Sequence, residues 1–264
     1  LTDGSLVSEA RVLLALEEEA RCIRREYQVL LMAELGDLRE GCEEAELLAL
    51  VELAESLPHI RLMGLGANLS CFGNILPGHD NMAELSRLFD LAQERAGRPL
   101  ERLSGGNSSS YLMLEQGTLP AAVNDLRLGE SVLLGRLPCY DRPIEGQQQQ
   151  AFCIEAKIVE LKEKPSMPWG ECGATDSFGG KVAFADRGRR LRALAALGKQ
   201  EIYINGLVPL DSGVEILGGC SDYLVLDLTE SQQQYQLDDV LSFACDYAAL
   251  ATGMSSVYLD KEYL

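Results

Sequence analysis

A run of small polar residues stands at positions 102–114, where the sequence RLSGGNSSSYLML passes from glycines and short hydroxyl or amide side chains into an apolar stretch. Glycines let the backbone approach an anion closely, and Ser108 with its neighbours supplies hydroxyl groups beside the free N–H groups of a starting helix. The segment is therefore a candidate phosphate-binding loop. The alternative is an ordinary Asn or Ser cap on a helix at 109–117, which needs only one such residue.

Two arginines and an asparagine are the next candidates. Arg127 lies in the apolar stretch NDLRLGESVLLG, where a guanidinium is costly unless it meets a ligand or a carboxylate in a buried salt bridge. Arg39 lies in ELGDLREG, where it could bind a ligand or pair with Asp37 or Glu40 at the surface. Asn68 follows another apolar stretch, in GANLSCFGN. Each candidate comes near the end of a predicted strand.

The elements that must position these residues alternate between helix and strand. Apolar periodicity predicts helices at 7–24, 43–56, 81–96 and 109–117, and strands at 27–35, 60–68, 100–106 and 124–135. Nearly continuous apolar strands between helices predict a parallel sheet covered by helices, either doubly wound or closed as a β/α barrel. In both architectures a ligand lies at the carboxyl ends of the strands, where the candidates fall.

The pattern changes after about residue 138. Apolar stretches separated by Pro, Gly and Asp turns predict a mostly antiparallel β domain, with a loop at 135–150 and one weakly helical stretch at 189–197. The strands are expected at 150–164, 201–210, 213–229 and 239–247. The predicted domains are therefore 1–138 and 139–264. Four strand-helix units are half of an eight-stranded barrel, and they begin with a helix, so either the sheet is open or an N-terminal part is missing.

Composition narrows the class of protein. Asp and Glu outnumber Lys and Arg by 41 to 23, a formal charge of −18, which disfavours nucleic acid and anionic membranes as partners. No apolar run approaches the roughly 18 residues of a membrane helix. Eight cysteines without a C-x-x-C pair and two histidines give no zinc-site spacing, so no metal is expected. Without a visible signal peptide, the protein is expected to be cytoplasmic with reduced thiols.

Longer motifs then suggest a family. The stretches LGDLREG, GLGANLSCFGN, SGGNSSSYLMLEQGTLP and NDLRLGESVLLGR resemble the pyridoxal-phosphate-dependent alanine/ornithine racemase family, which has the alanine racemase-like fold type III. The likeness continues through the C-terminal β domain. It implies the C-terminal half of a (β/α)8 (TIM-type) barrel followed by that domain, pyridoxal 5'-phosphate as cofactor, and a homodimer. It also implies a free amino acid as substrate, with ornithine or another basic amino acid ahead of alanine.

The resemblance assigns roles to matching positions. Arg127 would hydrogen-bond the pyridine nitrogen of the cofactor, and Ser108 with the Gly129 amide would hold the phosphate. Arg39 would lie near the phenolic oxygen or the substrate carboxylate. Asn68 stands where alanine racemases proper place a histidine, a departure that favours the ornithine-type branch. The remaining cofactor-binding candidates are Asn107, Glu130 and Ser256, with Ser255 and Tyr258 as neighbours that could take the place of Ser256.

The family's chemistry also needs a Schiff-base lysine on the first barrel strand, which acts as one of the two proton-transfer bases. No lysine matches it, because the six lysines all follow residue 138: Lys157, Lys162, Lys164, Lys181, Lys199 and Lys261. The chain is therefore expected to be an N-terminally truncated fragment of a racemase. The alternative is a non-catalytic barrel protein that binds pyridoxal phosphate or another phosphorylated ligand without that lysine.

The second base is a further open point. Alanine racemases take a tyrosine from the β domain of the partner subunit, whereas the corresponding stretch WGECGATDSFGG has none. Cys172 or Asp176 in this stretch could approach the facing barrel mouth and serve as the catalytic base. The alternative is a turn that only packs on the partner.

Overall fold

The computed structural model describes residues 2–140, 142–180 and 183–263, and the chain divides into two compact units, Leu1–Gln149 and Gln150–Leu264. The sequence placed the boundary after residue 138, within a loop at 135–150. A short antiparallel pair, β6 (Arg136–Leu137) with β7 (Arg142–Pro143), extends the first unit instead. Gln149 Nε2 also donates to the Gly135 carbonyl at 2.5 Å, which ties the end of this segment back to the first unit.

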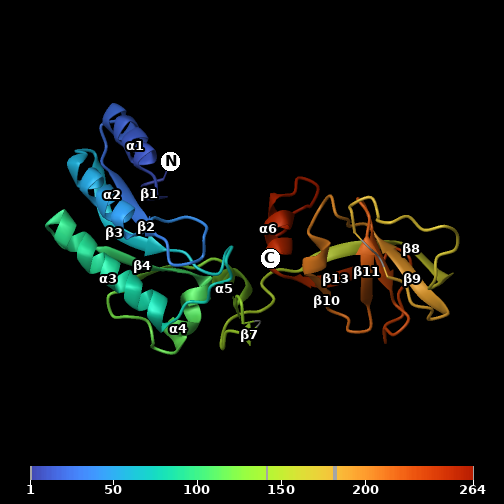
Figure 1. Cartoon of the computed structure of the whole chain (residues 1–264). Helices are drawn as coiled ribbons and strands as arrows, with labels where there is room; N and C mark the ends of the chain where they lie inside the picture. The colour runs from blue at the N-terminus through green and yellow to red at the C-terminus, as the bar shows by residue number, and fades with distance from the viewer. Residues whose placement is uncertain (1, 141, 181–182, 264) are drawn as a thin grey trace. The chain divides into compact units, whose positions relative to one another are not determined.

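The first unit is built on a five-stranded parallel sheet of order β1-β2-β3-β4-β5 (Figure 1). The strands are β1 (Gly4–Val7), β2 (Tyr27–Ala33), β3 (Ile60–Ala67), β4 (Arg102–Asn107) and β5 (Asp125–Arg127). The expectation that the chain begins with a helix was wrong, because β1 precedes the first helix and pairs in parallel with β2. Only Val7 of this four-residue strand is buried, so it carries no apolar pattern.

Helices follow or precede each strand of this sheet. They are α1 (Ala10–Cys22), α2 (Glu44–Ser56), α3 (His79–Ala96), α4 (Tyr111–Glu115) and α5 (Glu130–Leu134). The three longest, α1 to α3, lie side by side against the sheet (Figure 1). The predicted helix at 109–117 is a 3-10 turn, Ser108–Ser110, followed by α4. The predicted strand at 124–135 is wrong beyond Arg127, where the chain turns into α5.

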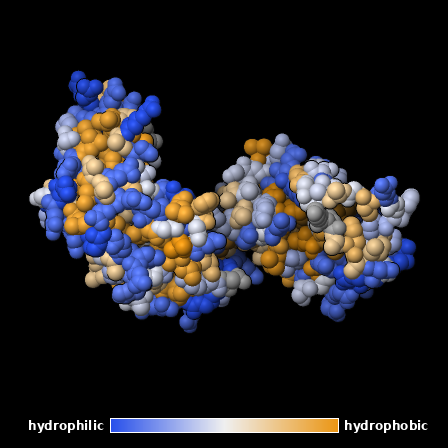
Figure 2. All heavy atoms as spheres, in the orientation of Figure 1, coloured by the Kyte–Doolittle hydropathy of each residue, from blue (hydrophilic) through white to orange (hydrophobic). Residues whose placement is uncertain are grey.

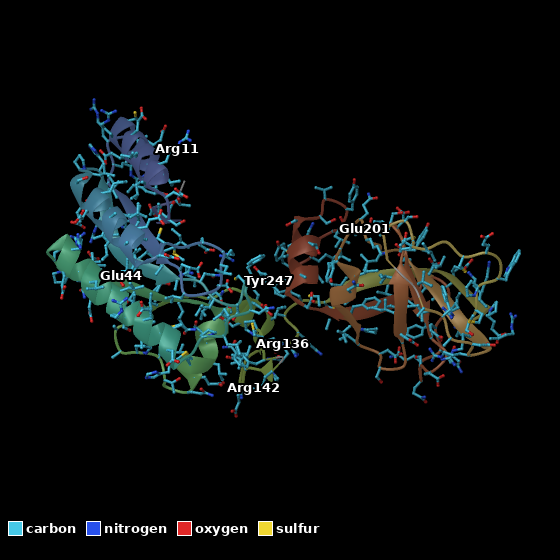
Figure 3. All side chains as sticks on the ribbon, in the orientation of Figure 1. Arg11, Glu44, Arg136, Arg142, Glu201 and Tyr247 are labelled. Carbon is cyan, nitrogen blue, oxygen red and sulfur yellow. The ribbon has the colours of Figure 1, made fainter. Side chains whose placement is uncertain are left out.

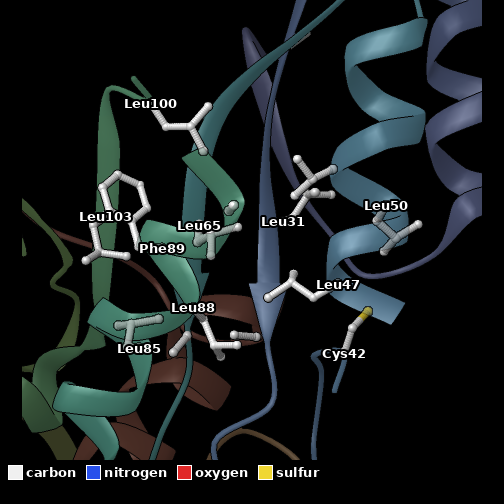
Figure 4. Close-up of a cluster of buried hydrophobic side chains, with 14 of the residues drawn as sticks. Leu31, Cys42, Leu47, Leu50, Leu65, Leu85, Leu88, Phe89, Leu100 and Leu103 are labelled. Atoms are coloured by element: carbon white, nitrogen blue, oxygen red, sulfur yellow. The ribbon is translucent and has the colours of Figure 1, made fainter. Parts of the chain in front are cut away.

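The core of the first unit lies between the sheet and these helices (Figure 4). Leu31, Leu65 and Leu103 on three neighbouring strands are fully buried against Leu47 of α2 and Leu85 of α3. Nearly continuous apolar strands are buried along their length in this way, which is why their sequence pattern was readable.

Ion pairs link α2 to α3 at the surface (Figure 3, where Glu44 is labelled). Three arginines in or just after α3 contact three glutamates of α2: Arg87–Glu44 at 2.5 Å, Arg95–Glu52 at 2.5 Å and Arg98–Glu55 at 2.6 Å. All six side chains are partly exposed, so each pair contributes about 1 kcal/mol or less. The apolar contacts beneath them carry most of the packing energy.

The second unit is a six-stranded antiparallel sheet of order β10-β13-β8-β9-β12-β11, and its described residues include one α-helix. Its elements are β8 (Ile154–Pro165), β9 (Arg189–Ala195), β10 (Leu207–Pro209), β11 (Glu215–Gly219), β12 (Leu224–Asp227), β13 (Val240–Cys245) and α6 (Tyr247–Ser255). The helical prediction for 189–197 was wrong, because that segment is β9 and pairs with β8 on one side and β12 on the other. Pairing on both sides outweighs its weak helical periodicity.

Three other boundaries in the second unit differ from the expectation. The strand expected at 201–210 is only Leu207–Pro209, preceded by a 3-10 turn, and the stretch 213–229 forms two strands rather than one. The strand expected at 239–247 ends at Cys245 because Asp246 caps α6, its side chain accepting the Ala249 amide at 2.8 Å.

The predicted fold class is confirmed: a partial β/α barrel is followed by a mostly antiparallel β domain. Among the described residues, no helix combines the length and apolar character that a bilayer crossing requires.

Candidate functional site

The predicted site residues of the first unit gather at the carboxyl ends of its parallel strands, which lie at one edge of the sheet. Asn107 Nδ2 donates to Asn68 Oδ1 at 3.0 Å, which joins the ends of β4 and β3. Ser108 Oγ accepts the Gly129 amide at 3.0 Å, which joins the ends of β4 and β5. Residues from the ends of three strands, β3, β4 and β5, are thus brought into one cluster.

Ser108 is the centre of the polar contacts after β4. Its hydroxyl oxygen is buried, accepts from the Gly129 amide at 3.0 Å and the Ser131 amide at 3.2 Å, and lies 3.1 Å from the Ser131 hydroxyl. A serine oxygen has two lone pairs, which the two amides fill, so the hydroxyl proton of Ser108 is left to donate to Ser131 or to a ligand. Ser108 therefore presents a donor beside the backbone amides that begin α5.

Asn107 fulfils the capping alternative that the sequence left open. Its Oδ1 accepts the Ser109 amide at 2.7 Å and so starts the 3-10 turn. Capping does not account for Ser109, whose hydroxyl is buried without a hydrogen-bond partner in the described part of the chain. Such orphaned buried hydroxyls are rare in native proteins, and a bound ligand is one common reason for them.

Of the three glycines near this cluster, two are required by the local structure and one is not. A side chain on Gly105 would place its Cβ 2.7 Å from Val123 Cγ1, and Gly106 has a left-handed φ of 107°, so local packing and backbone conformation require both. Gly129 has neither constraint, because a Cβ there would meet nothing within 4 Å. The open side of the site is therefore at Gly129 and not at the two consecutive glycines.

Arg127 ends β5 and is half-buried. Its guanidinium donates to the Ser104 hydroxyl at 2.5 Å and to the Ala67 carbonyl at 2.7 Å, and no ion pair joins it to a carboxylate among the described residues. Burial lowers the pKa of this guanidinium, while the nearby Asp125 and Glu40 act in the opposite direction. The buried salt bridge that the sequence left open is not found, and two neutral oxygens hold a cationic donor in place.

Arg39 lies in the loop after β2 and pairs with the adjacent Glu40, with Nη2 2.6 Å from Oε1. These hydrogen bonds raise the pKa of the Arg39 guanidinium and lower that of the Glu40 carboxyl. Of the alternatives for Arg39, the contact with Glu40 is present and Asp37 is not its partner. Its role toward a ligand stays a prediction.

Sequence reasoning missed the role of Asp37. This carboxylate is buried, 2% exposed, and accepts backbone N–H groups from the loop after β3. The sequence offered it only as a surface partner for Arg39. Two apolar side chains beside these contacts, Leu38 and Phe72, are about 70% exposed. Figure 2 shows hydrophobic residues of this kind among the hydrophilic ones on the viewed face.

The remaining predicted residues lie in the second unit, apart from Glu130, which begins α5. Asp176 forms a turn, with Oδ1 accepting the Gly180 and Phe178 amides at 2.7 and 2.8 Å and Oδ2 lying 3.2 Å from Lys199 Nζ. The hydrogen bond from Gly180 lowers the pKa of this carboxyl the most, which makes Asp176 a weaker base. Cys172 is exposed and free.

Ser256 lines a cavity of about 460 Å³ in the second unit, beside the turn before β10. The other lining residues include Lys199, Glu201, Asn205, Thr252 and Ser255. Of the lysines, Lys157, Lys162 and Lys164 lie in β8 and Lys261 lies near the C-terminus, whereas Lys181 is outside the described residues. No group of three His, Cys, Asp or Glu side chains within the described ranges is arranged to hold a metal ion.

Comparison with known proteins gives the family of this fold and site. The model of the family described as "Alanine racemase, N-terminal domain" matches residues 5–136. An ornithine racemase of Acetoanaerobium sticklandii is 41% identical over 263 residues, which cover 99% of this chain and 74% of that protein. The chain belongs to the alanine racemase family. A lysine racemase of Thermotoga maritima is 38% identical over 263 residues, 99% of this chain and 72% of that protein.

Solved structures show the same fold. An alanine racemase from Streptomyces coelicolor superposes with a TM-score of 0.64 at 21% identity, covering 90% of this chain. A D-threonine aldolase from Filomicrobium marinum superposes with a TM-score of 0.65 at 15% identity, covering 94% of this chain. The chain spans 62% of the length of each of these two structures. At such identities the likeness concerns the fold alone.

Proposed function

We propose that this chain supplies the cofactor cradle and the β domain of a pyridoxal-phosphate-dependent racemase of basic amino acids. The observation that carries the proposal is the polar cluster at the ends of β4 and β5: the Ser108 hydroxyl, the Gly129 amide that donates to it, and the Arg127 guanidinium. Membership of the alanine racemase family supports this choice of cofactor. The names of the two relatives, an ornithine racemase and a lysine racemase, support a basic substrate.

The polar cluster fits the chemistry of this cofactor. Ser108 and the Gly129 amide would hold the phosphate, and the orphaned Ser109 hydroxyl lies in the same turn. Arg127 would donate to the pyridine nitrogen, and because a guanidinium stays protonated at any physiological pH, it would not give up its proton to that nitrogen. When bound, pyridoxal phosphate withdraws electrons from the α-carbon of the amino acid and so acidifies its proton.

Racemisation then requires two bases on opposite faces of the α-carbon. One removes the α-proton, and the other returns a proton to the opposite face, so that no atom is gained or lost. The first unit contains no lysine, so no lysine within that unit can serve either role. For the second base we keep Cys172 and Asp176, and we place Cys172 first, because the carboxylate of Asp176 already accepts two amides and contacts Lys199.

We further propose a homodimer in which the loop between β8 and β9, which carries Cys172, meets the strand ends of a second copy. The apolar side chains exposed on this loop support a protein partner there: Met167, Trp169, Phe178 and Phe184. A monomer by sedimentation at micromolar concentration, combined with full racemase activity, would exclude this arrangement.

The test uses the gene's full-length product. It should bind pyridoxal phosphate with a shift in the cofactor absorbance, and it should racemise ornithine or lysine faster than alanine, as measured by polarimetry. Borohydride reduction followed by peptide mapping would locate any lysine that binds the cofactor covalently. Binding without racemisation of any of the three amino acids would favour the alternative, a non-catalytic protein that binds phosphorylated ligands. No binding would refute both.

A further inference from the structure

The buried carboxylate of Asp37 holds the loop after β3 through its backbone. It accepts the Cys71 amide at 3.1 Å, the Phe72 amide at 3.2 Å and the Gly73 amide at 3.1 Å, and the Asp37 carbonyl also accepts the Gly73 amide at 2.9 Å. Within the described residues no cation pairs with this carboxylate. The N–H groups of the neighbouring loop therefore offset the cost of burying its charge.

A directional chain of hydrogen bonds runs from Asp37 to the candidate site. Asn68 Nδ2 lies 3.5 Å from Asp37 Oδ2, and Asn68 Oδ1 accepts from Asn107 Nδ2 at 3.0 Å. Asn107 Oδ1 accepts the Ser109 amide at 2.7 Å. A carboxylate can only accept, so the nitrogen of Asn68 must face Asp37, and its oxygen must then face Asn107. The contact of Asn107 Nδ2 with the Leu69 carbonyl at 2.8 Å fixes the same orientation independently.

Both loops joined by Asp37 are strained. Leu38, Ser70 and Asn74 have left-handed φ values of 57°, 60° and 55°, a conformation that side chains other than glycine rarely adopt. Gly73 accepts no side chain, because a Cβ there would lie 2.8 Å from the Asp37 carbonyl oxygen. Such strain persists only where surrounding contacts enforce it, and it gathers at functional sites. The four hydrogen bonds to Asp37 tie the two loops together, while the Leu38 amide also donates to Glu34 Oε1 at 3.2 Å and the Ser70 hydroxyl to the Ile75 carbonyl at 2.8 Å.

We propose that Asp37 is a positioning residue for the cofactor site, acting through Asn68 and Asn107 on the turn that carries Ser108. The inference rests on the proposed function of that site. It also changes the expected part of Asn107. The polar atoms of this side chain are occupied by Asn68, Leu69 and Ser109. Asn107 therefore orients the turn, and ligand contact is left to Ser108. The device needs no residue from the second unit.

The first experiment measures amide hydrogen exchange by NMR in the chain and in Asp37→Asn. The variant keeps the shape but replaces an acceptor oxygen by a donor, so protection of the Cys71, Phe72 and Gly73 amides should fall by about tenfold or more. Protection of the Ser109 amide should fall with them, although it makes no contact with Asp37. The matched control is Asp227→Asn, a carboxylate of the second unit that is also 2% exposed, which should leave these four amides unchanged.

A second variant distinguishes loss of the hydrogen-bond chain from Asp37 to the Ser109 amide, called the relay below, from general loss of structure. Asn68→Ala removes the middle link but keeps the bonds from Asp37 to the loop amides, so the Ser109 amide should lose protection while the Cys71 amide keeps it. If the Ser109 amide stays protected in Asn68→Ala, the relay does not exist. This outcome is readable even if Asp37→Asn folds poorly, because Asn68→Ala alone decides it.

The functional arm uses the full-length gene product and pyridoxal phosphate as the probe. Asp37→Asn should weaken cofactor binding by about tenfold or more, as expected when a residue that orients a binding group is lost. Asp227→Asn should bind as the wild type does, with a similar loss of thermal stability. Equal binding by both variants would overturn the positioning role. Failure of the wild type to bind would refute the proposed function, whereas the exchange data would still decide the relay.

Discussion

Replacing Ser108 by alanine tests the candidate site and its packing together. The substitution removes one oxygen that accepts two backbone amides and lies 3.1 Å from the Ser131 hydroxyl, at a position that is 5% exposed. The Ser131 hydroxyl can rotate to another acceptor, but the two amides cannot. A buried donor left unpaired costs about 1–3 kcal/mol. Gly129 borders open space, so water can reach its amide. The free-energy cost of an unpaired donor therefore arises mainly at the Ser131 amide.

The expected loss of unfolding free energy is therefore about 2 kcal/mol for Ser108→Ala. The matched control is Ser110→Ala in the same turn, which removes a single hydrogen bond from the Ser110 hydroxyl to the Gly105 carbonyl and should cost about 1 kcal/mol. Urea unfolding followed by circular dichroism gives both values, provided that the first unit unfolds as its own transition.

The same pair of variants examines phosphate binding. If Ser108 contacts the phosphate in the full-length gene product, Ser108→Ala should weaken pyridoxal phosphate about tenfold, yet change the affinity for pyridoxal, which lacks the phosphate, far less. Ser110→Ala should change neither affinity. Equal losses for the two ligands would show that the substitution disturbs the site as a whole. If Ser108→Ala is as stable as Ser110→Ala, then loss of the Ser108 hydroxyl does not leave a buried amide unpaired.

Three further outcomes are expected. Arg127→Leu in the full-length gene product should abolish racemisation by polarimetry while circular dichroism stays native, and unchanged activity would discard the role at the pyridine nitrogen. Gly64→Ala should lower the free energy of unfolding by more than about 3 kcal/mol or prevent folding. The reason is that Gly64 has a φ of 155° and a new Cβ would lie 1.7 Å from the Arg102 carbonyl oxygen. A urea midpoint near that of the wild type would contradict this contact. Burial raises the pKa of the Cys42 thiol from 9.0 to about 11. Between these pH values the folded chain keeps a proton that the unfolded chain loses. The free energy of unfolding should therefore fall as pH rises from 9 to about 11. Cys42→Ala should show a smaller fall across this window in urea midpoints.

The sequence predicted those elements whose burial is uniform along their length. Strands β2 and β3 were readable because almost every residue in them is buried. The segment β9 was not, because RRLRALA has charged residues on the face that the neighbouring strands leave partly exposed. It becomes a strand through pairing with β8 and β12, and no local window contains those partners. Helix α6 was hidden for another reason, since it follows β13 with only the cap Asp246 between them.

Within the site, residues that act through their side chains were predictable and residues that act on the backbone were not. Ser108 and Arg127 stand out because a hydroxyl cluster and a charge interrupt apolar stretches, and both lie in the cluster at the strand ends. Asp37 gave no such signal, because it binds main-chain amides 34 to 36 residues away, and every residue except proline has one. Only the glycine at 73, which the close approach requires, marks that contact in the sequence.

The loop after β2 holds two neighbouring charged residues, Asp37 and Arg39, in different environments. The sequence left Arg39 either as a ligand contact or as a surface partner of Asp37 or Glu40. Arg39 pairs with Glu40, whereas Asp37 is buried. Leu38 between them has a left-handed φ of 57°, so the backbone from Asp37 to Arg39 continues neither as a strand nor as a helix. A positive φ at a leucine has no sequence signature. The sequence therefore allowed for the pairing of Arg39 with Glu40, but it gave no sign of the buried Asp37 carboxylate, to which we assign the positioning role.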